Sequence, residues 1–152
     1  MQKKTILLPL LALLLLIIGV VGISHRDFSP AVHSSLTNLA TLKAMARDAV
    51  PYEVAMSNGK PSLIEFYADW CQTCQSLAAT LEQLHQKHGE SVNFIMLNID
   101  DPQWHQQIQT YQVTGVPQLT FLRANHEIAD TLIGKVPGVV IEDALGNLEF
   151  RI

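Results

Sequence analysis

The chain has 152 residues, of which 16% are charged and 48% are hydrophobic, and its formal net charge is −4. This length fits one domain of ordinary size with an appendage. Because the net charge is negative and no basic surface is indicated, we exclude nucleic-acid binding.

The first segment in chain order, residues 6–23, contains no charged residue. As a helix it would be roughly 27 Å long at ~1.5 Å per residue, close to the thickness of a bilayer's hydrocarbon core. A cleaved signal peptide is the alternative, but residues 20–22 are a poor version of its small-x-small cleavage site. We therefore expect residues 1–23 to be a retained transmembrane anchor. Lys3 and Lys4 precede the uncharged segment at residues 6–23, which predicts an N-terminus in the cytoplasm and the remaining chain on the exported side.

Residues 24–50 should form a polar tether, which contains Pro30, and then a short amphipathic helix. Ser34 and Ser35 are candidate caps for this helix, which should end before Pro51. Its apolar residues recur at helical spacing at Leu36, Leu39, Leu42 and Met45.

Residues 51–152 should form one domain of alternating helices and strands. Residues 62–67 are mostly apolar, which is typical of a strand buried on both faces. The expected elements are helices at 51–56, 71–88, 102–110 and 137–145, the last with Gly146 at its end, and strands at 62–67, 92–99, 118–123 and 128–133. This order predicts a small α/β sandwich.

The two cysteines of the chain, Cys71 and Cys74, lie where the strand at 62–67 is followed by a helix. The free N–H groups and the dipole at the start of a helix favour a thiolate. Cys71 should be the more exposed sulfur and the nucleophile, while Cys74, one turn further on, resolves the mixed disulfide. A structural disulfide is disfavoured because so short a loop adds little stability. The dithiol is itself a two-electron carrier, so no cofactor is expected.

A metal site is not expected either. Zinc needs four ligands, and the chain has no second cysteine pair to complete such a set. His85 and His88 are three residues apart on one predicted helix, a spacing that can bind metal. On a polar helix face, however, such side chains are usually solvated.

The motif W-C-x-x-C after a strand, with Val116-Pro117 and a hairpin further along, resembles the thioredoxin fold over residues 51–148. More narrowly, the motifs E-F-Y-A-D-W-C and V-N-F-I-M-L-N-I-D-D-P-Q-W, with the anchor, are similar to the membrane-anchored thioredoxin-like proteins that face the thylakoid lumen in chloroplasts and cyanobacteria. The resemblance implies a central mixed sheet with helices on both faces, plus one N-terminal transmembrane helix.

The resemblance also implies roles for individual residues. A buried acid at the position of Glu65 would exchange the proton of Cys74, and burial would raise its pKa; alternation along the strand could instead turn Glu65 to a solvated face. Pro117 would be the cis-proline that lies against the sulfurs and leaves the backbone groups of Val116 free for a bound substrate chain, although a lone X-Pro bond is usually trans. Trp70 would lie beside the thiols and shape the docking surface.

The function implied is a membrane-anchored thiol–disulfide oxidoreductase. As a reductase it would receive electrons from a thiol-transferring membrane protein and pass them to protein disulfides of the lumen or periplasm, including the cysteines of apocytochromes. A disulfide oxidase or isomerase, and a redox-inactive assembly module of the same fold, are the alternatives. Gln72-Thr73 between the cysteines, Met96 near Glu65 and Ala79 in the helix depart from the common thioredoxin pattern. They leave the direction of electron flow open.

Overall fold

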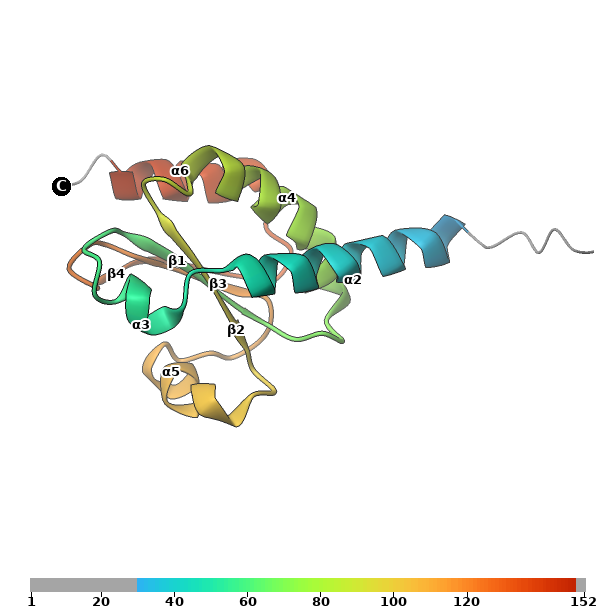
Figure 1. Ribbon diagram of the computed structural model, residues 1–152, viewed down its shortest axis with the longest axis horizontal. Helices are drawn as coiled ribbons and strands as arrows, with labels where there is room; N and C mark the ends of the chain where they lie inside the picture. Colours follow the sequence, from blue (N-terminus) through green and yellow to red (C-terminus); the bar gives the residue numbers. More distant parts are fainter. Residues whose placement is uncertain (1–29, 150–152) are drawn as a thin grey trace, which may run out of the picture. The chain divides into compact units, whose positions relative to one another are not determined.

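The computed structural model describes residues 30–149 of the chain. Four strands within these residues form one mixed sheet (Figure 1). β1 pairs parallel with β2 and antiparallel with β3, and β3 pairs antiparallel with β4. The strands are β1 (Ser62–Tyr67), β2 (Asn93–Asn98), β3 (Gln118–Leu122) and β4 (Ile128–Ile133), in the spatial order β2-β1-β3-β4. The predicted strands are confirmed, with ends that differ by no more than one residue.

Helices cover both faces of this sheet, as predicted. Figure 1 shows α4 and α6 on one side and α3 and α5 on the other. Each side has its own cluster of buried apolar side chains. The helices are α2 (Pro30–Asp48), α3 (Tyr52–Ala55), α4 (Gln72–His88), the 3-10 helix η1 (Pro102–Trp104), α5 (His105–Thr110) and α6 (Gly138–Glu149).

β1 lies between the two clusters and is buried along its whole length. Leu63 and Tyr67 pack into the cluster that contains side chains of α4 and α6. Ile64 and Phe66 pack into the other cluster. The prediction of a strand buried on both faces is confirmed. Because successive side chains alternate, Glu65 points to the same side as Leu63 and Tyr67.

The first described helix differs from the expectation. α2 begins at Pro30 rather than behind Ser34 and Ser35, so the predicted polar tether is wrong from residue 30 onward. Proline is well accepted in the first turn of a helix, because its missing N–H would have no partner there. Leu42 is fully buried whereas Leu36 is 55% exposed, so the second half of α2 supplies the contact with the domain.

The last helix also differs. α6 continues through Gly146 to Glu149, whereas the sequence predicted an end at the glycine. Leu145 and Leu148 on this helix are buried. Burying such side chains contributes about 1.5–3 kcal/mol each, which outweighs the cost of roughly 1 kcal/mol for a glycine inside a helix.

The predicted anchor at residues 1–23 and the tether at residues 24–29 lie outside the described residues. Within residues 30–149, none of the helices combines the length and the apolar character that a membrane crossing requires.

Candidate active site

A disulfide joins Cys71 and Cys74 at the start of α4, with their Cα atoms 5.3 Å apart. Cys71 is the N-cap of the helix, and its Sγ accepts a hydrogen bond from the backbone N–H of Cys74 at 3.1 Å. In this way the sulfur takes the place of a capping side-chain oxygen. Cys71 is 6% exposed and Cys74 is fully buried. Cys71 is therefore the sulfur that a partner can reach first.

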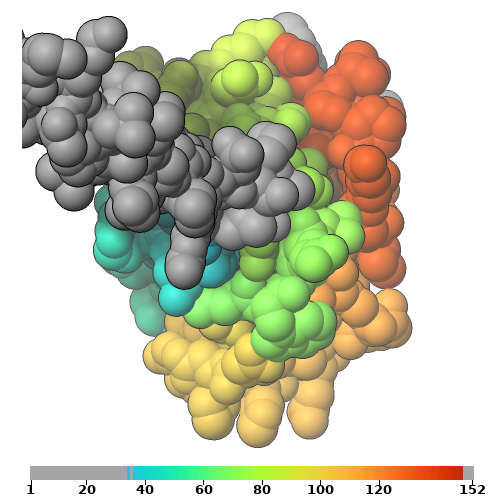
Figure 2. Space-filling model, turned by 90° about the vertical axis from the view of Figure 1, so that its right-hand side faces the viewer, coloured from blue at the N-terminus to red at the C-terminus, as the bar shows by residue number. Residues whose placement is uncertain are grey.

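The connection from β1 to α4 carries Trp70, whose side chain is 64% exposed. The indole Nε1–H donates to Oδ2 of Asp100 at 2.9 Å, which fixes the ring from the far end of β2. The amide of Gln75 donates to the Asp69 carbonyl at 2.7 Å. Figure 2 shows the end of the domain at which this connection (green) lies beside the segment that follows β2 (yellow). A large aromatic surface is thus held open to solvent next to the disulfide.

Val116 and Pro117 come directly before β3 and are joined by a cis peptide bond. The register pairs Phe66 with Gln118, so Pro117 lies at the end of the sheet where β1 leads to Cys71. The Pro117 carbonyl accepts a hydrogen bond of 2.8 Å from the N–H of Gly134. Gly134 has φ +82°, a conformation that favours glycine, so the chain after β4 turns at this residue and ties Pro117 in place.

Glu65 is 2% exposed, so the alternative of a solvated face is wrong. Its strand neighbours are Met96 and Leu119, neither of which carries a charge. Neither carboxyl oxygen has a hydrogen-bond partner among the described residues. Removal from water penalises the charged form, and this desolvation raises the pKa of Glu65 from 4.5 to about 8. The carboxyl group is therefore mostly protonated at neutral pH.

The histidines of α4 differ in their surroundings. His85 packs its ring on Phe94, with ring centroids 4.9 Å apart. His88 is only 9% exposed, so the expectation of a solvated side chain is wrong for this residue. Its position four residues after Leu84 continues the buried stripe of the helix, a signal that the sequence did contain. Within residues 30–149, no three His, Cys, Asp or Glu side chains are grouped as metal ligands.

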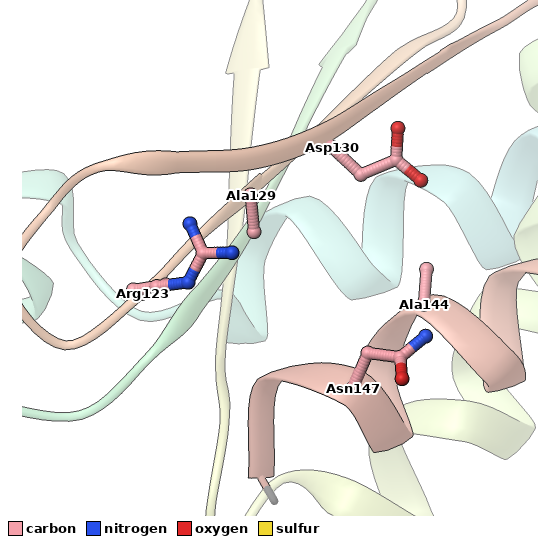
Figure 3. Close-up of a pocket in the computed structure, with 5 residues that line it drawn as sticks. All are labelled: Arg123, Ala129, Asp130, Ala144 and Asn147. Atoms are coloured by element: carbon pink, nitrogen blue, oxygen red, sulfur yellow. The ribbon is translucent and has the colours of Figure 1, made fainter. Parts of the chain in front are cut away.

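A separate polar pocket of about 190 Å³ lies between the β3–β4 hairpin and α6. Figure 3 shows Arg123 and Asp130 on the hairpin side and Asn147 on the helix side of this space. None of the predicted site residues lines it. The pocket is therefore separate from the disulfide chemistry.

The structure thus brings Cys71, Cys74, Trp70 and the Val116–Pro117 bond to one end of the sheet, and it buries Glu65 beneath α4 in β1. Asp100 is the contributor that the sequence analysis missed. Its contact with Trp70 joins residues 30 apart in the chain, a pairing that no local pattern encodes.

A disulfide at the N-terminus of a helix, next to a mixed sheet with a cis-proline at the start of the adjoining strand, defines a domain with a thiol–disulfide oxidoreductase centre. The thioredoxin family model matches residues 43–146. The chain belongs to the thioredoxin family.

Within this family, the chain is similar to thiol:disulfide interchange proteins and to chloroplastic thioredoxin-like proteins. The chain is 38% identical over 147 residues to the thiol:disulfide interchange protein TxlA of Synechococcus elongatus, covering 97% of this chain and 72% of that protein. It is 41% identical over 97 residues to the chloroplastic thioredoxin-like protein HCF164 of Oryza sativa, covering 64% of this chain. That match spans only 37% of the rice protein. Among solved structures, a mutant thioredoxin from Halobacterium salinarum has a TM-score of 0.57 at 26% identity, covering 64% of this chain and 82% of that one.

Proposed function

We propose that the protein is a membrane-anchored reductase of protein disulfides on the exported side of its membrane. The observation that carries the proposal is the Cys71–Cys74 disulfide at the start of α4, with the exposed Trp70 and the Val116–Pro117 bond at the same end of the sheet. These features offer a substrate chain an aromatic surface and a cis X-Pro bond beside the reactive sulfur.

The reaction follows from the positions of the two sulfurs. In the reduced protein, the Cys71 thiolate attacks a substrate disulfide, forms a mixed disulfide and releases the first substrate thiolate. Cys74 gives its proton to Glu65 in its ionised form, which is the minor form at neutral pH, and attacks Sγ of Cys71. The Cys71–Cys74 disulfide forms, the second substrate thiolate leaves, and two electrons have passed to the substrate.

The membrane location is supported by the uncharged residues 6–23 and the lysines before them. The rice relative is named as a chloroplastic protein. On this basis the domain would face a thylakoid lumen or a periplasm. In such an oxidising compartment the pair needs an electron supply, which a thiol-transferring membrane protein would provide. Disulfides formed by apocytochrome cysteines are among those that the protein would reduce.

A test by trapping addresses substrate and direction together. Cys74→Ala leaves Cys71 able to attack but removes the resolving thiol, so mixed disulfides with native partners should accumulate. The control is the double variant Cys71→Ala/Cys74→Ala, which should capture none. If Cys74→Ala captures no partner although removing the protein abolishes its biological role, the redox-inactive assembly module is favoured.

The reduction potential separates the reductase from an oxidase or isomerase. A reductase should have a potential well below that of protein disulfide isomerase, which is about −180 mV. Equilibration of the Cys71–Cys74 pair with glutathione redox buffers gives the value directly. A potential near or above that of the isomerase would contradict the reductase proposal.

A further inference from the structure

Glu65 borders a small cavity between α2, α4 and the sheet, about 10 Å³ in volume. This is close to the smallest space that holds one water molecule. The cavity is enclosed mainly by apolar side chains, among which Glu65 and His85 are the titratable groups. The lining residues are Met45, Ala49, Leu63, Glu65, Leu81, His85, Phe94, Ile95 and Met96.

His85 forms the outer wall of this cavity. Its side chain is partly exposed, whereas Glu65 is almost fully buried. One face of its ring packs on Phe94. A Cβ atom added to Gly89 would come within 2.6 Å of Cδ2 and 2.9 Å of Nε2 of His85, so the ring uses the space that the missing side chain leaves. The imidazole is thus held between Phe94 and Gly89, with contact to the cavity and to solvent.

To exchange a proton with solvent, the buried Glu65 needs a neighbour such as His85 that can carry one. Neither of its oxygens is hydrogen-bonded within the described residues, and the adjacent β2 position is Met96, which cannot carry a proton. The residues that α2 and β2 contribute to the cavity are uncharged. Tyr67 on the same strand also interacts with Glu65, and its pKa is raised by desolvation, by Asp69 and by Glu65. Cys74 of α4 is buried in the apolar cluster that contains Leu63 and Tyr67. Neither of these two residues lines the cavity.

We propose that His85 is the proton relay between Glu65 and solvent, acting through the cavity. The inference rests on the proposed function, in which Glu65 takes the proton of Cys74. Before Cys74 resolves the mixed disulfide, the protonated Glu65 passes its proton to the imidazole, directly or by one water, and the imidazolium releases it to solvent. A carboxylate is then present to take the proton of Cys74. Once Cys74 has given up its proton, Glu65 is protonated again, with no change in electron count. When the disulfide is reduced, Glu65 returns this proton to Cys74 and regains one from solvent through His85.

The experiment follows the oxidation of the reduced protein by excess oxidised glutathione, with tryptophan fluorescence in a stopped-flow instrument between pH 6 and pH 9. His85→Gln should slow the step in which Cys74 resolves the mixed disulfide by roughly tenfold near pH 7, less than the about 100-fold or more usual for direct proton transfer. Adding imidazole should restore the rate in proportion to its concentration. The matched control is His105→Gln, on the exposed face of α5, which should behave as wild type.

Two further variants separate a relay from a packing role. His85→Phe keeps an aromatic ring against Phe94 but has no titratable nitrogen, so it should be as slow as His85→Gln. In a Glu65→Gln background, His85→Gln should cause no additional loss. The proposal is overturned if the His85 variants match wild type, if imidazole does not restore them, or if the two changes slow the step independently. A wild type that reacts neither with glutathione nor with the protein disulfide insulin would instead contradict the proposed function.

Discussion

Replacing Glu65 with glutamine should change how stability depends on pH. Glu65 is buried with no hydrogen-bond partner for either oxygen among the described residues, and its pKa rises from 4.5 to about 8 in the folded protein. The folded state therefore prefers the protonated carboxyl group, while the unfolded chain ionises it above pH 4.5. The cost to folding is small below that pH, grows as the pH rises, and levels off above pH 8.

The size of this cost follows from the shift in pKa. At about 1.4 kcal/mol for each pKa unit, the full cost is about 5 kcal/mol, and about 3 kcal/mol of it is present at pH 7. Between pH 5 and pH 8 the wild type should lose about 3 to 4 kcal/mol relative to Glu65→Gln, which does not titrate. This is a large part of the roughly 5–15 kcal/mol that stabilises an ordinary domain.

The assay is denaturant unfolding of the disulfide-bonded forms at several pH values between 5 and 9. The control is Glu82→Gln, the same chemical change on the exposed face of α4, which should follow the wild type. The quantity of interest is the difference in unfolding free energy between wild type and Glu65→Gln. If this difference stays constant across the range, the reasoning about the buried carboxyl group is wrong.

Three other variants test separate parts of the structure. Asp100→Ala removes the acceptor for the Trp70 indole, so insulin reduction should show a higher KM with stability changed by no more than about 1 kcal/mol; an unchanged KM would show that Trp70 needs no such partner. Phe66→Ala empties a fully buried position beside Tyr111 and should cost about 3–5 kcal/mol in denaturant unfolding, and a much smaller loss would contradict the packing described. Gly146→Ala places a Cβ in open space inside α6 and should stabilise by about 0.5–1 kcal/mol, whereas a loss in melting temperature would indicate a contact that the helix lacks here.

The sheet could be predicted because its strands carry local signals. The apolar run at β1, the turn residues between β3 and β4, and the Asp101-Pro102 pair that starts η1 each act over a few residues. Asp101 caps this turn by accepting from the N–H of Gln103 at 3.1 Å, as a short-range pattern requires. The ends of α2 and α6 could not be predicted in the same way. Tertiary packing of Leu145 and Leu148 carries α6 past Gly146.

The site was predictable to the extent that it depends on sequence position. The spacing of Cys71 and Cys74 predicted the reactive pair, and the family resemblance predicted roles for Pro117 and Glu65. The surroundings of Glu65 were not predictable, because the cavity is built from α2, α4 and two strands that meet only in the folded chain. The same holds for Asp100, which reaches Trp70 from another connection.

The two halves of the site are held by different physical means, and this has a measurable consequence. The docking half consists of Trp70 and Pro117, and hydrogen bonds fix both residues. Trp70 donates to Asp100, and the Pro117 carbonyl accepts from Gly134. The half that exchanges protons is Glu65, whose carboxyl oxygens are buried without a hydrogen bond from the described residues. The residues of the two halves have no hydrogen bond in common within the described chain, so Asp100→Ala and Glu65→Gln should act independently.

Independence can be measured in the double variant. Asp100→Ala should raise the KM for a protein disulfide at every pH, and Glu65→Gln should alter the pH profile of the resolving step for any disulfide, glutathione included. Their effects on the logarithm of the rate should add. Strong non-additivity would show that substrate docking at Trp70 changes the environment of Glu65, and the proton step would then depend on the partner bound.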